Sequence, residues 1–309
     1  PVIADFAMGE DARTITFPDG ETRAFTLEDV AFNLGAGRNK QAFIYQMEMD
    51  DDDVFYVLPA EWNVAEGAWE ALSLAENWPD DAYAFGPNCA GCHTVGVDTS
   101  DYDWEEEGVS CESCHGPGLE HVELADDAGG SIDDEERVGI YASINLGFSA
   151  DTCAQCHVRG LAEDGIHPYP VNFYPQFHDL ADFYTPVSTD DTEHWWPSGH
   201  AQLPNMQHNE WLLSGHPNAL ASAQESEDFS AECLTCHSTA QQLVDLRLAN
   251  EDIDPATIDA LAIAEETGLG ITCASCHNAH NVSDDDDEDA ETVALPANLR
   301  EESYTLCIS

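Results

Sequence analysis

Residues 87–121, PNCAGCHTVGVDTSDYDWEEEGVSCESCHGPGLEH, contain the pattern Cys-x-x-Cys-His twice. The pattern occurs three more times downstream, and the five copies are Cys89/Cys92/His93, Cys111/Cys114/His115, Cys153/Cys156/His157, Cys233/Cys236/His237 and Cys273/Cys276/His277. Composition alone predicts about 0.02 such pentads. Two thiols three positions apart can each form a thioether with one haem vinyl group, and the next histidine can then bind the iron. The repeated pattern therefore predicts five covalently attached c-type haems.

Two cysteines at this spacing can serve other purposes, and one cysteine of this chain lies outside the five units. Disulfides and zinc knuckles also use Cys-x-x-Cys, but neither requires a histidine directly after the second cysteine each time. The odd residue is Cys307, in the final Leu306-Cys307-Ile308-Ser309, which is how a sixth unit would begin. We expect Cys307 to start a truncated sixth haem site, with a free thiol and an intermolecular disulfide as alternatives.

The chain is extremely acidic, with 62 aspartates and glutamates against 8 lysines and arginines and a formal net charge of -54. This charge excludes nucleic acid as a partner. Self-repulsion of this size strains a compact fold at low ionic strength, but at about 1 M salt the Debye length falls to about 3 Å and the repulsion largely vanishes. We therefore interpret the surface as that of a halophile's protein, from an archaeon working in brine.

The expected fold is mostly irregular and α-helical, with a small N-terminal β module and stacked c-type haems as its organising element. Residues 1–85 hold no Cys or His, and their β-rich runs 41–49 and 54–58 predict a hairpin with an acidic turn. Residues 86–167 hold the first three haem units. Residues 168–230 form an aromatic and His-rich segment expected to wrap the haems, and residues 231–309 hold the last two units and the possible sixth.

Three local features are predicted around these units. Gly116-Pro117-Gly118 prevents the chain from continuing as a helix after His115 and turns it back. Residues 207–214 have helical character. A further helix is predicted with Asp254 as its N-cap, Ile258, Leu261 and Ala262 as its apolar stripe, and Gly268 at its end.

Five irons also need five distal ligands. Eight histidines lie outside the motifs: His121, His167, His178, His194, His200, His208, His216 and His280. The surplus permits six-coordinate haems throughout, which suits electron transfer because neither axial position opens to a substrate. His280 follows His277 by three residues, too close to bind the same iron from the opposite face, so it is expected to reach another haem. His200 is a further candidate for a distal ligand, and His167 and His194 are the candidates after it.

Four stretches carry a family resemblance: GVSCESCHGPGLEH (108–121), CAQCHVRG (153–160), MQHNEWLLSGH (206–216) and CASCHNAH (273–280). They resemble motifs of multihaem c-type cytochromes, a family that includes soluble electron carriers and the extracellular cytochrome nanowires of bacteria and archaea. The resemblance implies bis-histidine ligation, haems in alternating parallel and T-shaped pairs, and no substrate pocket. It also implies that His121, His208, His216 and His280 are distal ligands.

The setting is expected to be extracellular. Attachment of haem to Cys-x-x-Cys-His takes place outside the cytoplasmic membrane in this family, so the resemblance implies export. No window approaches the ~18 consecutive apolar residues of a membrane span, and no signal peptide precedes Pro1, so we expect a mature, soluble product.

Function is therefore expected to be electron transfer rather than catalysis. We expect end-to-end contacts between copies to build a homopolymeric filament, which exchanges electrons with redox partner proteins or extracellular acceptors. The alternative is a reductase in which one haem stays five-coordinate and binds substrate, although the negative charge would repel an anionic one. A monomeric soluble shuttle shares the chemistry of the filament and differs only in assembly.

The charge predicts that folding depends on salt. Between about 0.1 M and about 3 M salt the carboxylate repulsion is progressively screened, so the melting temperature should rise across the series. Thermal unfolding followed by circular dichroism measures this. Equal stability at the two ends of the series would contradict a halophilic surface.

Overall fold

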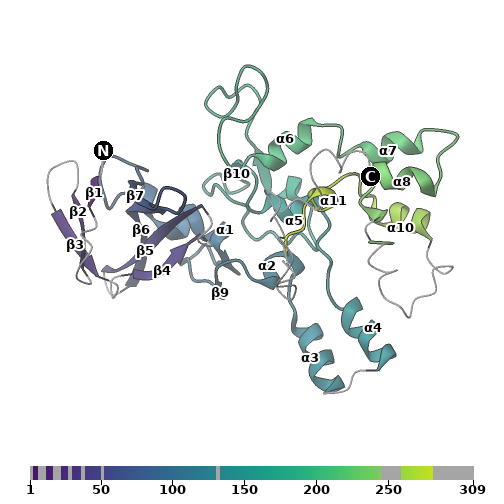
Figure 1. The fold of residues 1–309 in the computed structure, drawn as a ribbon, viewed down its shortest axis with the longest axis horizontal. Coiled ribbons are helices and arrows are strands. Elements are labelled where there is room, and N and C mark those ends of the chain that lie inside the picture. The colour runs from purple at the N-terminus through teal and green to yellow at the C-terminus, as the bar shows by residue number, and fades with distance from the viewer. Residues whose placement is uncertain are drawn as a thin grey trace, which may run out of the picture. The chain divides into compact units, whose positions relative to one another are not determined.

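The computed structural model describes residues 3–5, 12–16, 22–26, 30–35, 39–49, 52–129, 133–241, 243–244 and 259–280. The chain divides into two compact units, Pro1–Ser113 with Leu161–Val171, and Cys114–Gly160 with Asn172–Ser309. Strands dominate the first unit and short helices the second (Figure 1). Mixed helices and small sheets thus form the fold, while the four-part division at residues 85, 167 and 230 stays a prediction.

Two antiparallel sheets form the start of the first unit. The strands are β1 (Ile3–Asp5), β2 (Ala12–Thr16) and β3 (Thr22–Thr26) in one sheet, and β4 (Val30–Leu34), β5 (Lys40–Met49), β6 (Asp52–Asn63) and β7 (Ala68–Ala71) in the other, each in sequential order. Met49 pairs with Asp52, so the predicted hairpin is confirmed. Its two turn residues lie outside the described part of the chain.

The core of this unit lies against the second sheet and ends at the first haem motif. Ile44 of β5 and Val57, Leu58 and Ala60 of β6 are buried together with Trp78, Tyr83, Phe85 and Ala90. The Trp78 indole N–H donates to the Val57 carbonyl at 2.8 Å, which satisfies its polar atom inside the core. Because Ala90 stands between Cys89 and Cys92, the sheet's own core holds the first motif in place.

Short elements complete the first unit. They are η2 (Asp81–Tyr83), η3 (Gly86–Ala90), α1 (Gly91–His93), β8 (Thr94–Val95) and β9 (Glu106–Glu107). β8 and β9 pair antiparallel, with Thr94 opposite Glu107. The loop 96–105 between them returns the chain toward the first motif.

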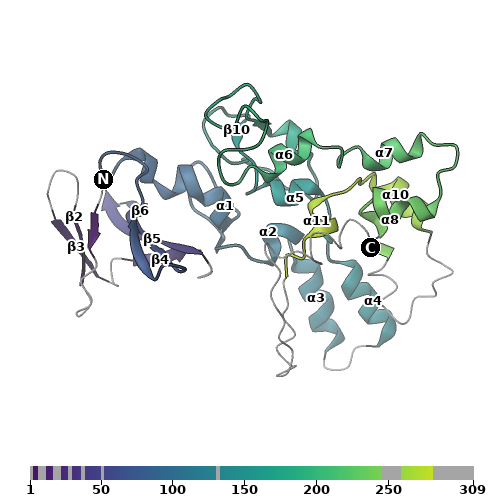
Figure 2. The same cartoon turned by 45° about the horizontal axis from the view of Figure 1, so that its top comes forward.

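The second unit is built from helices of four to ten residues and a few irregular turns. In chain order the elements are α2 (Cys111–His115), at whose middle the unit begins, α3 (Leu119–Ala128), α4 (Asp134–Ala142), α5 (Ala150–Ala154), η4 (Leu180–Asp182), β11 (Tyr184–Pro186), α6 (Gln207–Leu213), α7 (Ala219–Gln224), η5 (Ala231–Cys233), α8 (Leu234–His237), α10 (Ala260–Thr267) and α11 (Cys273–Cys276). The strand β10 (Gly160–Ala162) begins at the last residue of this unit's first segment and continues into the first unit. Figures 1 and 2 show α3 and α4 lying side by side. No described helix is long and apolar enough to cross a membrane.

Local predictions in this unit are confirmed at three points. Gly116, with φ of 72°, ends α2, and α3 begins at Leu119, so the chain turns where Gly-Pro-Gly stands. α6 matches the helix predicted at 207–214. Gly268, with φ of 62°, ends α10 in the left-handed conformation that glycine adopts at low cost.

The start and the buried face of α10 were predicted wrongly. Its N-cap is Asp259, whose carboxylate accepts the N–H groups of Leu261 and Ala262, whereas Asp254 and Ile258 lie outside the described residues. Leu261 and Ala262 are exposed, and Ile263 and Ala264 are buried instead. The helix packs through the 263–264 side because the apolar cluster around Leu220 and Leu234 lies there.

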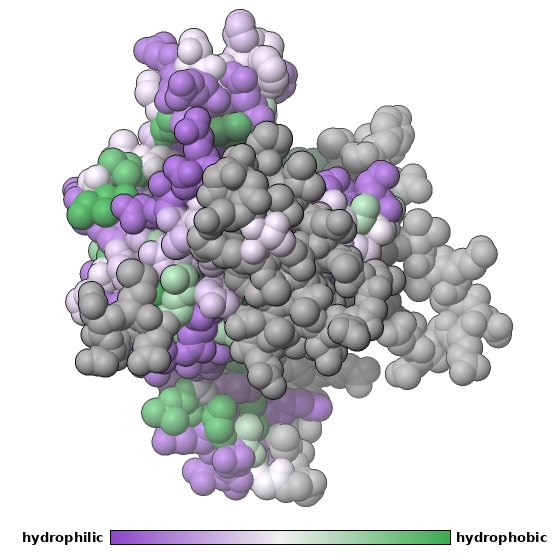
Figure 3. Space-filling model, turned by 90° about the vertical axis from the view of Figure 1, so that its left-hand side faces the viewer, coloured by the Kyte–Doolittle hydropathy of each residue, from purple (hydrophilic) through white to green (hydrophobic). Residues whose placement is uncertain are grey.

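Hydrophilic residues predominate over the described surface drawn in Figure 3, and hydrophobic ones gather in small separate patches. Leu119 and Val122 of α3 are examples of exposed apolar side chains, at 68% and 53% exposure.

The Tyr83 hydroxyl gives a test of this core. It accepts the Leu74 N–H at 3.0 Å and donates to the Leu72 carbonyl at 3.0 Å, and Tyr83 is fully buried. Tyr83→Phe should lower the free energy of unfolding by about 1–3 kcal/mol because a core N–H loses its acceptor. Urea unfolding at constant high salt measures the change. Tyr56→Phe is the control, since its hydroxyl has no hydrogen bond among the described residues; equal effects would contradict this role.

Candidate haem-binding sites

Each Cys-x-x-Cys-His unit occupies a helical turn. The first ends α1, the second is α2, the fourth ends α8, and the fifth begins with α11. In the third, the His157 N–H donates to the Cys153 carbonyl at 3.0 Å, and in the fifth the His277 N–H donates to the Cys273 carbonyl at 2.9 Å. Residues three and four apart lie on one face of a helix. Two cysteines and a histidine at this spacing in a regular helical turn lie on one side of it, as attachment to one porphyrin requires.

The ten motif cysteines lie where a porphyrin can reach them. Cys236, in α8, is exposed, and so is Cys111. Cys156 is half-buried, and its N–H donates to the Cys153 carbonyl at 3.3 Å, which keeps the third motif within one turn. The remaining half-buried cysteines are Cys89, Cys92, Cys114, Cys153, Cys233, Cys273 and Cys276. These positions fit thioether attachment, but the thioether bonds themselves, at Cys156 and Cys236 as at the other eight, stay a prediction.

Three of the five proximal imidazoles are oriented through their Nδ1 atoms. His237 Nδ1 contacts the Ala219 carbonyl at 3.2 Å, His157 Nδ1 contacts the Gln207 side-chain oxygen at 3.1 Å, and His115 Nδ1 contacts the Asn145 carbonyl. A carbonyl accepts, so Nδ1 carries the proton and Nε2 keeps its lone pair. This is the arrangement of outer partners that orients metal-binding histidines. The donor set thus fits haem, whose iron supplies one-electron chemistry when it is bound.

The first motif is packed tightly against a tyrosine from residues 161–171 of the same unit. A Cβ at Gly91 would lie 2.0 Å from the Tyr169 ring, so only glycine fits between the two cysteines at this point. Tyr169 is buried, and its hydroxyl donates to the Gly86 carbonyl at 2.9 Å. Burial raises the pKa of Cys89 to about 11 and lowers the pKa of His93, which keeps both groups neutral.

A second buried group lies next to Tyr169, and the sequence indicated only its histidine. His167 is 5% exposed, its Nδ1 lies 2.5 Å from an Asp164 carboxylate oxygen, and its Nε2 lies 3.1 Å from the Tyr102 hydroxyl. Both ring nitrogens therefore have partners within the protein. The spacing Asp-x-x-His was the only available sequence signal for these partners, because Tyr102 is 65 residues away.

The second unit brings the third and fifth motifs together. The helix α5, which holds Cys153, contacts α11, which begins at Cys273. The Trp211 indole N–H donates to the Ile271 carbonyl at 2.8 Å, which fastens α6 beside the fifth motif. Two attachment sites 120 positions apart in sequence are thus neighbours.

His208 is the most distinctive of the predicted distal ligands. It is 4% exposed, its ring lies 5.2 Å from that of Trp211, and neither ring nitrogen has a hydrogen-bond partner among the described residues. The nearest carboxylate oxygen, on Asp151, is 3.6 Å from Nε2 and so beyond hydrogen-bond range. Buried polar atoms are normally paired. A buried imidazole nitrogen without a hydrogen-bond partner is available to bind a metal ion.

The other predicted distal ligands lie in different surroundings. His121 Nδ1 lies 3.2 Å from the Ile140 carbonyl, which leaves Nε2 available. His216 is exposed, and its carbonyl accepts the Ile271 N–H at 3.1 Å, close to the fifth motif. The His200 side chain is 79% exposed beside Glu210. Cys307 lies outside the described residues, so a sixth site stays a prediction, as do the roles of these histidines.

Comparison with known proteins agrees with the motif geometry. The family model "Cytochrome c554 and c-prime" matches residues 65–116, which include the first two motifs. The crystal structure of the outer cell wall cytochrome OcwA is similar at 25% identity and a TM-score of 0.64, covering 92% of this chain and 56% of that one. The chain is similar to multihaem c-type cytochromes. This family implies covalently bound haem c.

One further solved structure is similar to this chain. An undecahaem cytochrome from the S-layer of Carboxydothermus ferrireducens matches at 20% identity and a TM-score of 0.49, covering 92% of this chain and 36% of that one. No curated protein matches. The chain spans about half the length of the OcwA chain.

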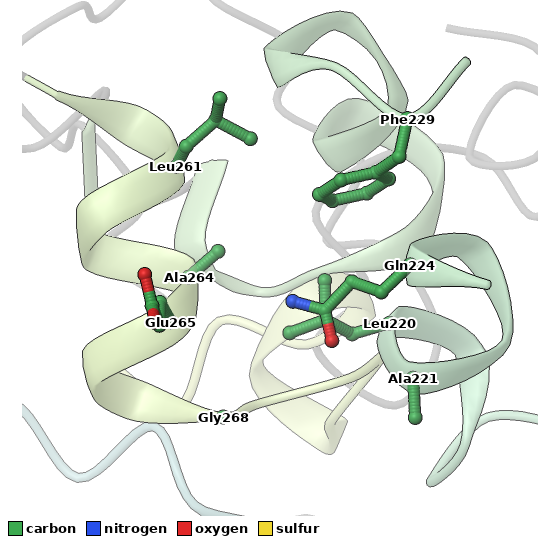
Figure 4. A pocket seen from close by; sticks show the side chains of 8 residues that line it. All are labelled: Leu220, Ala221, Gln224, Phe229, Leu261, Ala264, Glu265 and Gly268. Carbon is green, nitrogen blue, oxygen red and sulfur yellow. The ribbon is translucent and has the colours of Figure 1, made fainter. Parts of the chain in front are cut away.

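A pocket of about 410 Å³ lies between α7 and α10, close to the fourth motif (Figure 4). Leu261 and Ala264 face Phe229 and Leu220 across it, and the Gln224 amide reaches into the gap. None of its lining residues is His, Cys or Met, so it offers no axial ligand to iron.

Gly91 gives a test of the first site. Gly91→Ala should lower the free energy of unfolding by about 1–3 kcal/mol, because the added methyl group would overlap the ring of Tyr169, which is buried. Urea unfolding measures stability, and the intact mass counts the haems. Gly139→Ala in α4 is the matched control: its Cβ meets nothing within 4 Å, so it should be neutral or stabilising by up to about 1 kcal/mol. Equal stability of the two variants would rule out the constraint.

Proposed function

We propose that this cytochrome carries electrons through five c-type haems, each held by one Cys-x-x-Cys-His unit and by a second histidine on the opposite side. The observation that carries the proposal is His208, a buried imidazole beside the third and fifth motifs whose ring nitrogens have no hydrogen-bond partner among the described residues. A second imidazole fills the position that a substrate would need. Closed axial positions favour electron transfer over catalysis.

The chain's own residues support this function by holding the ligands still. The Asn145, Gln207 and Ala219 oxygens fix the rings of three proximal histidines, so little rearrangement accompanies a change of charge at the metal. The contact between α5 and α11 brings the third and fifth attachment sites together. Close sites let electrons pass between neighbouring haems.

Assembly into an extracellular filament is the second part of the proposal. OcwA is an outer cell wall cytochrome, which supports a location outside the cytoplasmic membrane for this chain too. With about one haem per 60 residues, a compact chain has too little protein to cover every porphyrin, so haems near its ends are exposed or capped by a neighbouring copy. A head-to-tail contact of this kind need not close into a ring, and an open one gives a filament. Exposed ends would also exchange electrons with redox partner proteins or extracellular acceptors.

The acidic surface supports a source in a halophile, such as a halophilic archaeon. It also makes assembly depend on the salt concentration. At a net charge of -54, copies repel one another in dilute buffer, so their association should strengthen with salt. The reductase alternative requires one five-coordinate haem. No residue arrangement described above favours it.

One sample tests both parts. Native protein in about 3 M salt should give a ferric spectrum that is low-spin for every haem and light scattering from long particles, which electron microscopy would show as filaments. A high-spin component equal to one haem would contradict the closed conduit and favour a reductase. Monomers with every haem low-spin would replace the filament with a soluble shuttle.

A further inference from the structure

His115 and His280 face each other in the second unit although they are far apart in sequence. His115 ends α2 and belongs to the second motif, and His280 follows α11 and the fifth motif. Their ring centroids are 5.8 Å apart and their ring planes are within 6° of parallel. His115 Nδ1 is held by the Asn145 carbonyl, so the nitrogen left for a metal is Nε2.

This separation matches two imidazoles that share one metal ion. Metal–imidazole nitrogen distances are about 2.0–2.1 Å, and a ring centroid lies about 1 Å beyond its nitrogen, so two ligands on opposite sides of one iron have centroids about 6 Å apart. Direct contact between aromatic rings is also possible over about 4.5–7 Å. Two observations favour the shared metal: His115 belongs to a Cys-x-x-Cys-His unit, and His280 is too close to His277 to bind the fifth iron from the opposite face.

We propose that His280 is the distal axial ligand of the haem attached at the second motif, opposite His115. The proposal rests on the proposed function and adds to it the pairing of one distal histidine with one haem. It joins the chain after the fifth motif to the second motif, 165 positions earlier.

The pairing also sets the arrangement of haem sites within the second unit. The helix α5, which holds Cys153 of the third motif, contacts α11, which holds Cys273 of the fifth. Gly147 lies against both the Cys114 carbonyl of the second motif and the Thr152 side chain of α5. With His280 bound opposite His115, the second, third and fifth motifs form one cluster. The fifth haem site is then a neighbour of the second and third, and electrons need not follow the order of the motifs in the sequence.

The test removes the distal ligand and counts spin states. His280→Ala should convert one haem of the five from low-spin to high-spin in the ferric absorption and electron paramagnetic resonance spectra, without loss of haem by intact mass. His178→Ala is the matched control, because His178 is a half-buried imidazole of the same unit whose ring lies 4.5 Å from that of Phe183. It should leave the spectrum unchanged. No high-spin signal in His280→Ala, or an equal signal in the control, would overturn the proposal.

A second variant covers the case in which His280→Ala does not mature. His280→Met keeps an axial ligand and should raise the reduction potential of one haem, because methionine ligation raises the potential of c-type haems. An unchanged set of potentials would overturn the pairing.

The haem concerned is identified by removing its attachment site. Cys111→Ala with Cys114→Ala should leave four haems, and adding His280→Ala to that background should produce no further high-spin signal. A further high-spin haem would mean that His280 binds a different iron and would overturn the pairing. Failure of the proposed function has a different signature, namely a high-spin haem in the native protein before any substitution.

Discussion

The arrangement of two cysteines and a histidine within a single helical turn is the constraint on which this structure depends. It requires only one turn of helix at each site, and the second unit accordingly consists of short helices, such as α8 with four residues. Elements this short bury little apolar surface of their own. Isolated helices of this length are not stable in water, so their order must come from what they pack against. A large porphyrin bound at each turn is a suitable packing partner, because it would take the place of core that the chain does not provide.

The contacts of the proximal histidines link each local turn to the tertiary structure. The partners of His115, His157 and His237 are the oxygens of Asn145, Gln207 and Ala219. Each partner lies in a different segment from the motif that it supports, 18 to 50 residues away. The orientation of these imidazoles therefore depends on the fold of the whole unit, and the fold in turn buries His208, a predicted distal ligand. Haem ligation and folding are coupled in such a chain.

The chain has few lysines and arginines, so only a few carboxylates can pair with a positive side chain. Lys40, the only lysine, lies 2.5 Å from Glu61 and 3.0 Å from Glu70, and the hydrogen bond with Glu61 raises its pKa. Other carboxylates bind backbone N–H groups instead, as Asp259 does at the start of α10 and Asp80 at the start of η2. Such caps stabilise helix ends without a positive partner. They leave the long-range repulsion between carboxylates to be screened by salt.

The sequence by itself determined the features that act over a few residues. The motif spacing predicted five haem sites, the β-rich runs predicted the β5–β6 hairpin, and Gly116 and Gly268 marked ends of helices, because turn geometry and helical periodicity are local properties. Tertiary structure alone decided which distant side chains meet. The buried face of α10, the ring of Tyr169 against Gly91, the Asp164–His167–Tyr102 group and the approach of His280 to His115 all depend on contacts through space. Those contacts follow from how segments tens of residues apart pack together, and spacing along the chain carries no record of that packing.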